Sequence, residues 1–425
     1  MRTFYSAVFY LIIPFILLRL FWRSIKAPNY RQRWRERFAY YDRNFSQGVI
    51  WFHAVSVGEA EALFPLVRRL QQHNPQAKLL ITTTTPTGSA RVRAVLGQTV
   101  EHVYLPYDTP DTVKRFMQCF KPVLAVIMET EIWPNLFTYC GANDIPLYVI
   151  NARLSENSSS GYQKFPSLMH PVLANVKCVA AQTQEDAERF IAIGAKPEQV
   201  VTVGNIKFDL EIAEDIVKEG KQLKTSTFKD RFVWLAASTH KGEEQIFLDV
   251  YKTLKPKIPK LLLLIVPRHP ERFTEVTTLC GQNNLGVVTR TSKQPCNMDI
   301  DVYLADTMGE LKMLYAATDV AFVGGSMMPV GGHNLLEASA IGVPVLFGPY
   351  MTNFKEIANK VLAHNAAIQC HNKEAIVKAI QSVYLDIGYR NLLIANGKRF
   401  VRMNRGVIGK LFEMLSVELK QKSQK

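Results

Sequence analysis

Short apolar runs alternate with longer, partly polar stretches along most of this chain. Between Val49 and about Asp209 the apolar runs are VIWFHAV, KLLITTT, HVYLPY, PVLAVIME, PLYVINA and CVAAQT. A second series begins with FVWLAAST at residue 232 and continues through LLLLIVPRH, GVVTRT, VYLADT, VAFVGGS and VPVLFGP. Apolar runs of strand length separated by helix-length connections are typical of a parallel sheet covered by helices. The pattern therefore predicts an α/β protein with two doubly wound, Rossmann-like halves.

The boundary between the halves is expected in a polar stretch without a strand pattern. The segment EIAEDIVKEGKQLKTSTFKD is rich in charge and separates the two series. We therefore predict four parts, namely a membrane anchor at 1–22, a first domain at 23–210, a connection at 211–230 and a second domain at 231–425. Ligands of open α/β sheets bind beyond the carboxyl ends of the strands, so the loops there are expected to face a cleft.

The amino-terminal stretch TFYSAVFYLIIPFILLRLFW is almost wholly apolar and is long enough to cross a bilayer. Only Arg2 precedes it, whereas several basic residues follow from Arg23 onwards, and no small-residue cleavage site is present. This charge bias places the following domain in the cytoplasm. Because Pro14 and Arg19 interrupt the apolar stretch, a second interpretation is a helix that lies in the membrane interface instead of crossing the membrane. Both arrangements predict an anchor.

Composition narrows the choice of partner. The 425 residues are 48% hydrophobic and 21% charged, which describes a globular protein with sizeable cores. A net charge of +14 points to an anionic partner, which is a membrane surface, a phosphorylated substrate or nucleic acid. No nucleic-acid-binding motif is visible, so no nucleic acid is expected. The six cysteines are scattered without a CxxC pair, which favours reduced thiols and supports no metal site.

The stretch VAFVGGSMMPVGGHNLLEAS has the order strand, glycine-rich loop, helix. Glycines permit positive φ and close approach of the backbone to a ligand. The helix is expected to begin near Asn334, where unpaired N–H groups attract an anion such as phosphate. Glu337 is placed to hold a hydroxyl group, such as that of a ribose. The alternative is an ordinary strand-loop-helix unit in which the glycines only make turns.

Two acidic segments follow predicted strands. Glu59 lies at the turn after VIWFHAV, where a carboxylate could accept a proton from an attacking hydroxyl, or could simply complement the helix dipole. Glu61 is its rival. In METEIWPN, strand alternation would send Glu129 and Glu131 to one face if the strand continues that far. Two such carboxylates would raise each other's pKa, share a proton, or pair with a cation or metal.

Basic side chains also follow strands. Lys207 comes after VVTVGN, and Arg268 with His269 stands directly beyond LLLLIVP, where a planar guanidinium suits phosphate or carboxylate. Near residue 308, the turn DTMGE precedes the helix ELKMLYAA and could present backbone groups to a base edge, with Met308 packing on the ring. A plain helix cap is the competing interpretation.

Several long motifs occur in order over nearly the whole chain. They are KAPNYRQRWRERF (26–38), HAVSVGEAEA (53–62), TTTTPTGSARV (82–92), METEIWPN (128–135), GNIKFD (204–209), PRHPERF (267–273), DTMGELKMLY (306–315) and the glycine-rich stretch. In these motifs the chain resembles the bacterial 3-deoxy-D-manno-octulosonate (Kdo) transferases of lipopolysaccharide synthesis, which are GT-B glycosyltransferases. Where family members often carry a charged residue before GGHN, this chain has MMPV, so no charged contact is expected there.

The resemblance implies a membrane-anchored, inverting, metal-independent enzyme without cofactor. It would transfer Kdo from CMP-Kdo to the lipid A precursor, lipid IVA, at the bacterial inner membrane, with its body on the cytoplasmic side among anionic lipids. Glu59 would be the general base and Glu129 would support it. The donor-binding residues would be Lys207, Arg268, His269, Thr307, Met308, Gly309, Glu310, Ser326, Gly331, Gly332, Asn334 and Glu337. In the resembled fold the last helix crosses back to the first domain.

Two alternatives stay open on the sequence. A nucleotide-sugar epimerase can share the same two-half architecture but would not need an anchor. A catalytically inactive membrane scaffold could keep the fold but would not need Glu59 together with the nucleotide-binding loops.

Overall fold

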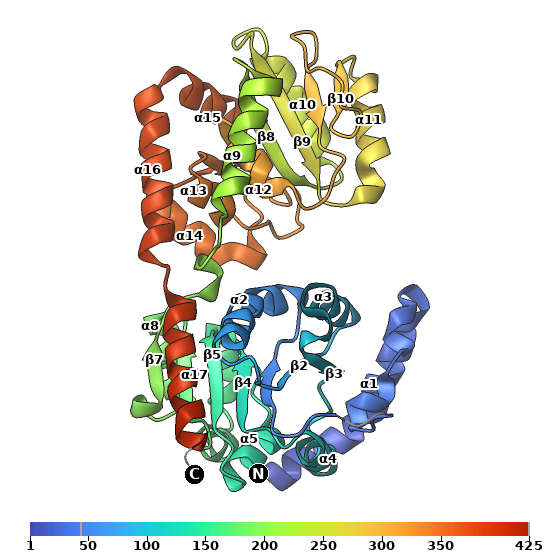
Figure 1. Ribbon diagram of the computed structural model, residues 1–425, viewed down its shortest axis with the longest axis vertical. Helices are drawn as coiled ribbons and strands as arrows, with labels where there is room; N and C mark the ends of the chain where they lie inside the picture. The colour runs from blue at the N-terminus through green and yellow to red at the C-terminus, as the bar shows by residue number, and fades with distance from the viewer. Residues whose placement is uncertain (43–44, 424–425) are drawn as a thin grey trace. The chain divides into compact units, whose positions relative to one another are not determined.

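Two parallel sheets, each of seven strands, organise the chain as the apolar runs predict. A computed structural model describes residues 1–42 and 45–423 (Figure 1). It divides into two compact units. Unit 1 comprises Met1–Asp209 and the carboxy-terminal stretch from Gly406, and unit 2 comprises Leu210–Arg405.

The sheet of unit 1 has the strand order β3-β2-β1-β4-β5-β6-β7, and all of its pairings are parallel. The order reverses between β1 and β4, which is the arrangement expected of a doubly wound sheet. The strands are β1 (Ile50–His53), β2 (Leu79–Thr83), β3 (Glu101–Tyr104), β4 (Leu124–Met128), β5 (Leu147–Ala152), β6 (Cys178–Ala181) and β7 (Val200–Thr202).

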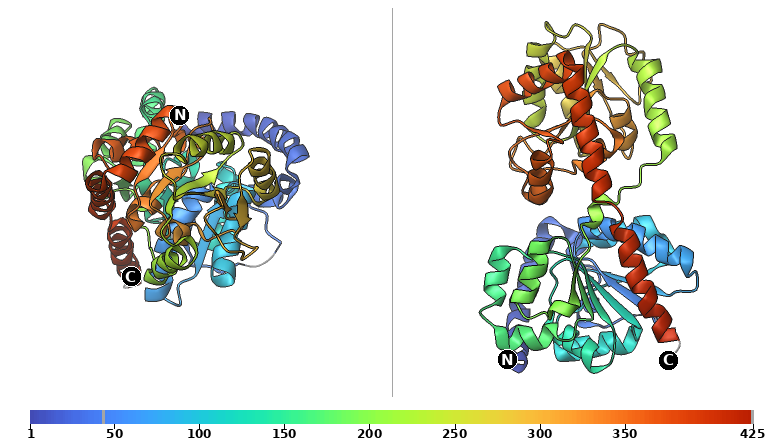
Figure 2. Two further views of the ribbon diagram at one scale, coloured as in Figure 1. Left: turned by 90° about the horizontal axis from the view of Figure 1, so that it is seen from above. Right: turned by 90° about the vertical axis from the view of Figure 1, so that its left-hand side faces the viewer.

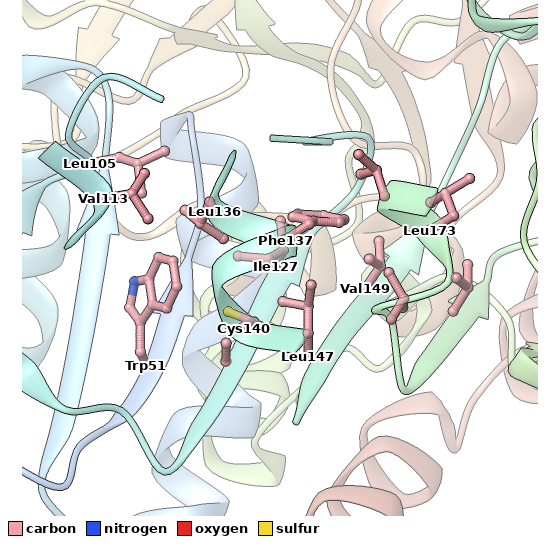
Figure 3. Close-up of a cluster of buried hydrophobic side chains, with 14 of the residues drawn as sticks. Trp51, Leu105, Val113, Ile127, Leu136, Phe137, Cys140, Leu147, Val149 and Leu173 are labelled. Atoms are coloured by element: carbon pink, nitrogen blue, oxygen red, sulfur yellow. The ribbon is translucent and has the colours of Figure 1, made fainter. Parts of the chain in front are cut away.

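Alternate residues of these strands enter two separate cores. Trp51, Ile127 and Val149 belong to the core on one face (Figure 3), and the neighbouring Phe52 and Val126 belong to the core on the other. This is why the strands read as continuous apolar runs, because both faces of the sheet are covered.

The helices of unit 1 are α1 (Arg2–Lys26), α2 (Val57–His73), α3 (Pro86–Leu96), α4 (Pro110–Phe120), α5 (Pro134–Ala142), α6 (Glu156–Tyr162), α7 (Pro166–Leu173), α8 (Gln184–Ala192) and α17 (Val407–Ser423). Residues of α2, α3 and α17 enter the core on one face of the sheet, and residues of α4, α5, α7 and α8 enter the core on the other.

The last helix, α17, completes unit 1 although it comes from the far end of the chain (Figure 2). Its residues Ile408, Leu411 and Leu415 enter the same core as Phe52. The Tyr148 hydroxyl on β5 donates a hydrogen bond of 2.9 Å to Glu418 Oε2. One of the two cores of unit 1 is therefore closed by the carboxyl terminus.

Unit 2 repeats the architecture with the strand order β10-β11-β9-β8-β12-β13-β14. Its strands are β8 (Phe232–Thr239), β9 (Leu261–Pro267), β10 (Val287–Thr289), β11 (Val302–Leu304), β12 (Val320–Val323), β13 (Val345–Phe347) and β14 (Ile368–Gln369). Its helices are α9 (Glu214–Leu223), α10 (Glu243–Leu254), α11 (Phe273–Gln282), α12 (Leu311–Ala316), α13 (Leu336–Ile341), α14 (Lys355–Ala363), α15 (Lys373–Leu385) and α16 (Ile387–Met403).

The observed division differs from the expected one in two places. Residues 211–230 are not a connection, because half of them form α9, which packs on α12 inside unit 2. The second domain does not run to residue 425, because the chain leaves unit 2 after Arg405. The polar composition of α9 hid its packing, since the helix lies at the surface with one narrow contact face in which Gly220 approaches the Met313 carbonyl.

The apolar amino-terminal stretch forms a helix. Within residues 1–42 and 45–423, Arg2–Ile25 is the one helix with the length and composition to cross a membrane, at a mean hydropathy of 2.0. Only 11% of its most apolar window is buried within the protein. This agrees with the expected anchor by length and composition.

We predict that Leu411→Ala will lower the free energy of unfolding by about 3 kcal/mol, because the fully buried leucine leaves a cavity in the core that α17 closes. The matched control on the same helix is Val417→Ala, whose side chain is 58% exposed and should change stability by less than about 0.5 kcal/mol. Urea denaturation of both variants measures the difference. Equal effects would show that α17 contributes no core packing.

Candidate active site

Glu59 is held at the start of α2 by a reciprocal cap. Ser56 is the N-cap residue, and its Oγ accepts the Glu59 N–H at 3.3 Å and donates to Glu59 Oε1 at 2.9 Å. The Val55 N–H donates to Glu59 Oε2 at 2.8 Å. Glu59 therefore does stabilise the start of α2, as the alternative interpretation expects, through a reciprocal cap with Ser56. A carboxylate has about four acceptor positions, so these two bonds leave it able to accept a further proton donor.

The Glu59 carboxyl is also electrostatically coupled to its surroundings. Burial raises its pKa, and the nearby Glu129 carboxylate adds to the rise. The hydrogen bonds from Val55 and Ser56 and the Lys207 charge act in the opposite direction. A carboxyl with a raised pKa is a stronger proton acceptor when it is ionised, which is what general-base chemistry needs.

Glu129 and Glu131 do not owe their positions to strand alternation. Strand β4 ends at Met128, and Glu129 has a φ of 57°, in the left-handed region and outside the extended range of a regular strand. Glu129 Oε1 instead lies 3.9 Å from Lys207 Nζ. The sequence is compatible with a cation, a shared proton or a metal beside this carboxylate. In the structure its partner is the Lys207 cation.

The Glu131 carboxyl has a strongly raised pKa. Burial raises its pKa to about 7, and the charges of Glu59 and Glu129 add to the rise while Trp133 opposes it. Both Glu59 and Glu129 therefore act on the Glu131 carboxyl. Within residues 1–42 and 45–423, no group of three His, Cys, Asp or Glu side chains is arranged to hold a metal ion.

Lys207 lies in a short 3-10 turn, Ile206–Phe208, that is fixed by buried amides. Asn205 Oδ1 accepts the Lys207 N–H at 2.9 Å, and Asn205 Nδ2 donates to Gln182 Oε1 at 2.7 Å. Asn151, at the end of β5, accepts the Ile206 N–H through Oδ1 at 3.0 Å. The sequence gives no sign of the roles of these buried amides, although Asn205 lies in the motif GNIKFD.

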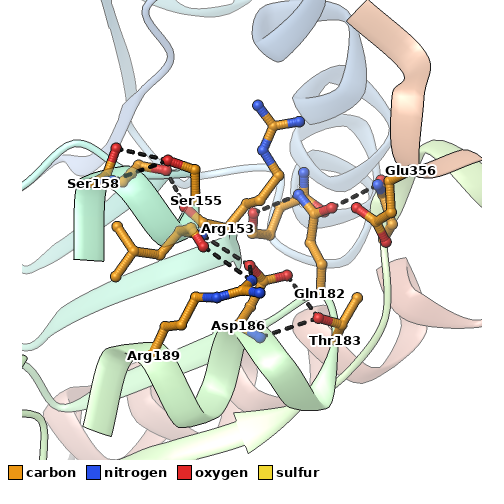
Figure 4. A network of polar contacts seen from close by, with 12 residues as sticks. Arg153, Ser155, Ser158, Gln182, Thr183, Asp186, Arg189 and Glu356 are labelled. Carbon is orange, nitrogen blue, oxygen red and sulfur yellow. Dashed lines mark hydrogen bonds and ion pairs between the residues drawn. The ribbon is translucent and has the colours of Figure 1, made fainter. Parts of the chain in front are cut away.

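Gln182 is part of a wider polar network at the carboxyl ends of β5 and β6 (Figure 4). Thr183 caps α8 by accepting the Asp186 N–H, and Asp186 Oδ1 accepts the Leu154 N–H at 2.9 Å. Arg189 Nη1 lies 3.6 Å from the same carboxylate oxygen. The loops that carry Lys207 are thus tied to a rigid framework, which keeps the lysine beside Glu129.

In unit 2 a buried carboxylate shapes the glycine-rich loop. Glu243 is fully buried at the start of α10. Its two oxygens accept the N–H groups of Gly325 at 2.7 Å, Ser326 at 3.0 Å and Met327 at 2.9 Å, and also that of His240 at 2.9 Å. Three of these four charge-assisted bonds fix the loop after β12, and the fourth ties it to the end of β8 through His240. Sequence reasoning missed Glu243 because it precedes the loop by about eighty residues.

The first glycine of the loop is required by packing. A Cβ at Gly324 would lie 2.8 Å from the carbonyl oxygens of both Ala237 and Ser238. The chain therefore passes against the end of β8 with no room for a side chain. This close approach is to the protein's own chain, so Gly324 serves packing between β12 and β8.

Several predicted donor-binding groups have internal partners. Ser326 Oγ donates to the Val323 carbonyl at 2.5 Å and accepts the Gly348 N–H at 2.8 Å, so the buried hydroxyl links the ends of β12 and β13. Helix α13 begins at Leu336 and has six residues, and Asn334 Oδ1 accepts the Leu336 N–H at 3.0 Å. The predicted start near Asn334 is therefore two residues early, and the Asn334 side chain bonds to the first N–H of the helix from outside it.

The other residues of this loop lie as follows. Gly331 and Gly332 have φ values of 110° and 74°, which explains the glycine pair. Glu337 lies half-buried in the first turn of α13, and its charge helps to raise the pKa of Tyr315.

A basic cluster stands beside the loop. His240 Nε2 lies 2.9 Å from His333 Nε2, with the two rings nearly parallel at 13°. The His269 ring lies 5.3 Å from that of His240. Burial lowers the pKa of His333 to about 4, and His240, Arg268 and His269 add to the effect. Arg268 and His269 were predicted here, whereas His240 and His333 were not.

The turn before α12 is fixed by an ion pair. Arg290 donates to Glu310 through Nε at 2.6 Å and Nη2 at 2.8 Å, and the Thr307 hydroxyl donates to the same carboxylate. Gly309 has a φ of 87°, and Met308 is 54% exposed. The exposed thioether is thus open to pack on a ring. Glu310 is the N-cap residue of α12, but its carboxylate bonds to Arg290 and Thr307 and makes no capping bond to the helix.

Comparisons with known proteins give the family. A family model described as 3-deoxy-D-manno-octulosonic-acid transferase (kdotransferase) matches residues 32–210, and a glycosyl transferases group 1 model matches residues 230–400. The 3-deoxy-D-manno-octulosonic acid transferase of Haemophilus influenzae is 38% identical over 99% of both chains. The chain belongs to the Kdo transferase family. The Kdo transferase of Bordetella pertussis is 36% identical over 75% of this chain and 76% of that one.

As a Kdo transferase, the chain is a glycosyltransferase with two α/β units of GT-B type, which confirms the fold and enzyme class implied by the motifs. A UDP-GlcNAc 2-epimerase from Neisseria meningitidis shares the fold, with a TM-score of 0.56 over 89% of this chain and all of that one. At 15% identity this likeness concerns architecture alone.

We predict that Glu131→Gln will stabilise the protein at pH 8 by up to about 3 kcal/mol, because the folded state must otherwise ionise a buried carboxyl. The raised pKa means that this penalty is absent below about pH 4.5 and grows as pH rises through about 7. Thermal unfolding at pH 5 and pH 8 measures the trend, with the exposed Glu61→Gln as control. A pH-independent difference would contradict the raised pKa.

Proposed function

We propose that this chain transfers Kdo from CMP-Kdo to the lipid A precursor, lipid IVA, by direct, inverting displacement. The observation that carries the proposal is the coupled cluster of Glu59, Glu129, Glu131 and Lys207 at the carboxyl ends of the unit 1 strands. It joins a proton acceptor to a cation within a family whose relatives are named as Kdo transferases.

Glu59 acts as the general base in this proposal. The acceptor hydroxyl oxygen forms a bond to the anomeric carbon of Kdo while the bond from that carbon to the phosphate oxygen of CMP-Kdo breaks. The hydroxyl proton passes to Glu59, and CMP leaves with the electron pair of the broken bond. Burial favours this proton uptake because it raises the Glu59 pKa.

Glu129 and Lys207 form the supporting pair. Glu129 raises the proton affinity of Glu59, and Lys207 keeps the cluster from carrying uncompensated negative charge. The lysine cation also suits the carboxylate of Kdo or the phosphate of the donor. Buried amides around Asn205 fix its backbone, so the charge is available in one place.

The donor contacts are assigned to unit 2. Arg268 supplies a planar guanidinium for the phosphate, next to His269 and the glycine-rich loop shaped by Glu243. Met308 packs on the cytosine ring, and Glu337 holds a hydroxyl. The remaining assigned residues contribute through backbone positions, namely Thr307, Gly309, Glu310, Ser326, Gly331, Gly332 and Asn334.

The acceptor and the location are proposed together. Lipid IVA and the inner leaflet of the bacterial inner membrane are both anionic, and the chain carries a net charge of +14 with an apolar amino-terminal helix. The catalytic body then lies on the cytoplasmic side.

A nucleotide-sugar epimerase remains the comparison to exclude by assay, because that class shares the fold. An epimerase would convert the nucleotide sugar without an acceptor, and an inactive scaffold would convert nothing. Incubation with CMP-Kdo and tetraacyl lipid A precursor, followed by mass spectrometry, separates these outcomes, since only a transferase adds the mass of Kdo to the lipid.

We predict that Glu59→Gln will reduce transfer by about a hundredfold or more, because the amide preserves the cap on α2 but cannot accept the acceptor's proton. Product formation at saturating donor measures the effect. Glu61→Gln is the matched control, since Glu61 lies on the same helix, is half-exposed and pairs with Arg91 at 2.8 Å.

Calorimetric titration with CMP and a thermal unfolding curve accompany both variants. Unchanged CMP affinity and stability with lost transfer identify Glu59 as the base. Near-normal turnover would remove it from that role, and lost CMP binding would make it a donor-site residue.

A further inference from the structure

Helix α1 contacts α4 and α5 of unit 1 through its amino-terminal half. Its buried or half-buried residues recur at helical spacing along one face, at Tyr5, Ser6, Val8, Phe9, Ile13, Ile16, Leu17, Leu20 and Ser24. From Ser6 to Ser24 this stripe extends over roughly 27 Å of helix axis. A helix with this contact face is docked to the protein.

The docking includes specific polar contacts. Asn135 Nδ2, in the first turn of α5, donates to Ser6 Oγ at 3.0 Å, and both residues are buried. The Tyr10 hydroxyl donates to the Asp111 carboxylate in the first turn of α4. At the other end, Arg31 Nε donates to Ser24 Oγ at 2.8 Å. Figure 1 shows α1 running past α5 and α4 within unit 1.

The partner of Ser6 is itself well anchored. Asp108, which is buried, accepts the N–H groups of Asn135 and Leu136 at 2.9 Å each, and its own carbonyl accepts from Asn135 Nδ2 at 2.7 Å. The Phe9 ring lies 6.5 Å from that of Tyr107, the residue before Asp108. The contact therefore joins α1 to a rigid part of unit 1.

The opposite face of α1 is apolar and exposed. Its residues, with their exposed fractions, are Phe4 (67%), Leu11 (72%), Phe15 (71%), Leu18 (58%), Trp22 (72%) and Ile25 (66%). They too recur at intervals of three, four or seven, so they form one continuous stripe. An exposed apolar stripe of this length, opposite a docked face, marks an interaction surface.

Charge identifies the occupant as a lipid surface. The first 35 residues contain seven Arg or Lys residues and no Asp or Glu. Arg19 and Arg23 are exposed on α1 itself, next to Trp22, and Trp34 beyond the helix is 49% exposed. Basic residues flanking an apolar stripe, with tryptophan at its edge, fit an anionic bilayer interface.

A membrane-crossing α1 is incompatible with these contacts. Residues 6 and 10 would lie in the hydrocarbon region. Either their partners Asn135 and Asp111 would also have to enter the lipid, or both hydrogen bonds would have to break. Asp111 is ion-paired with Arg115 at 2.8 Å, so following would bring a charged pair and the helix starts of α4 and α5 into lipid. Such groups are not tolerated there without compensation.

We propose that α1 lies in the plane of the membrane, clamped to α4 and α5 by its inner stripe, with its outer apolar stripe inserted among the lipids of one leaflet. The proposal rests on the membrane location given under Proposed function. It places the amino terminus on the same side of the membrane as the catalytic body, whereas a crossing helix would place it on the opposite side.

The first test locates the amino terminus. A full-length protein with an amino-terminal epitope tag is expressed in a Gram-negative host, and spheroplasts are treated with protease before and after lysis. The tag should survive in intact spheroplasts and be lost after lysis, together with a carboxy-terminal tag. Removal of the amino-terminal tag from intact spheroplasts would overturn the proposal.

The second test asks whether the docking persists in the membrane. In a parent with Cys119→Ser and Cys178→Ser, the pair Ser6→Cys and Asn135→Cys should form a disulfide on oxidation of isolated membranes, detected by peptide mass spectrometry. The control pair Leu11→Cys and Asn135→Cys should not, because Leu11 lies on the outer stripe. Absence of the first cross-link, with the protein still membrane-bound, would overturn the clamp.

The third test examines the outer stripe. Phe15→Asp should lower the membrane-bound fraction relative to the soluble one roughly tenfold or more, because it replaces an inserted ring by a charge. The control Leu392→Asp alters a residue that is 55% exposed on α16 and should leave the fraction unchanged. Release as a soluble, stable oligomer of the unaltered protein would instead assign the stripe to a second copy of the chain.

These tests can fail separately from the proposed reaction. Transfer of Kdo to detergent-dispersed acceptor does not depend on where α1 lies, so it should be retained by Phe15→Asp. Loss of transfer with an intact membrane topology would count against the proposed function and leave the in-plane helix standing.

Discussion

In each unit the parallel pairing of the strands dictates where chemistry can occur. Because all strands of a parallel sheet run in one direction, their carboxyl ends meet along one edge, and the loops there gather side chains from distant parts of the chain. In unit 1 this edge collects Glu59 after β1, Glu129 after β4 and Lys207 after β7. In unit 2 it collects Arg268 after β9 and the glycine-rich loop after β12. The same constraint makes both faces of the strands apolar and confines polar groups to the ends.

Buried carboxylates serve opposite purposes at these two edges. Glu243 accepts hydrogen bonds from four backbone N–H donors, which compensate its charge and fix the conformation of the loop. In unit 1, burial raises the pKa of Glu59 and Glu131, and neighbouring carboxylates add to the rise, while Lys207 opposes it at Glu59. A carboxylate whose hydrogen bonds are all made holds the structure rigid. A carboxylate whose charge is only partly compensated is ready to exchange a proton.

The sequence predicted the strands and the sheet class because burial on both faces leaves a strong, continuous apolar signal. It also predicted Glu59, Glu129, Lys207 and Arg268 at strand ends. It could not reveal the partners that decide their chemistry. Asn205 and Gln182 meet only after folding, as do Arg290 and Glu310, and His240 with His333. The return of α17 escaped periodicity analysis for the same reason, since an amphipathic helix shows that it has a buried face and does not show which core receives it.

The return of α17 has a consequence for how the protein is made. The helix that closes one core of unit 1 follows unit 2 in the chain, so it leaves the ribosome later than all of unit 2. Until then, apolar residues of the α2 face of the sheet, including Leu63 and Val67, have no cover from Leu411 and Leu415. Domains generally fold as units during synthesis, and transiently exposed apolar surface invites aggregation. Unit 2, whose chain is complete earlier, can be folded while unit 1 is still open, so the first-made half of this protein is the last to be finished.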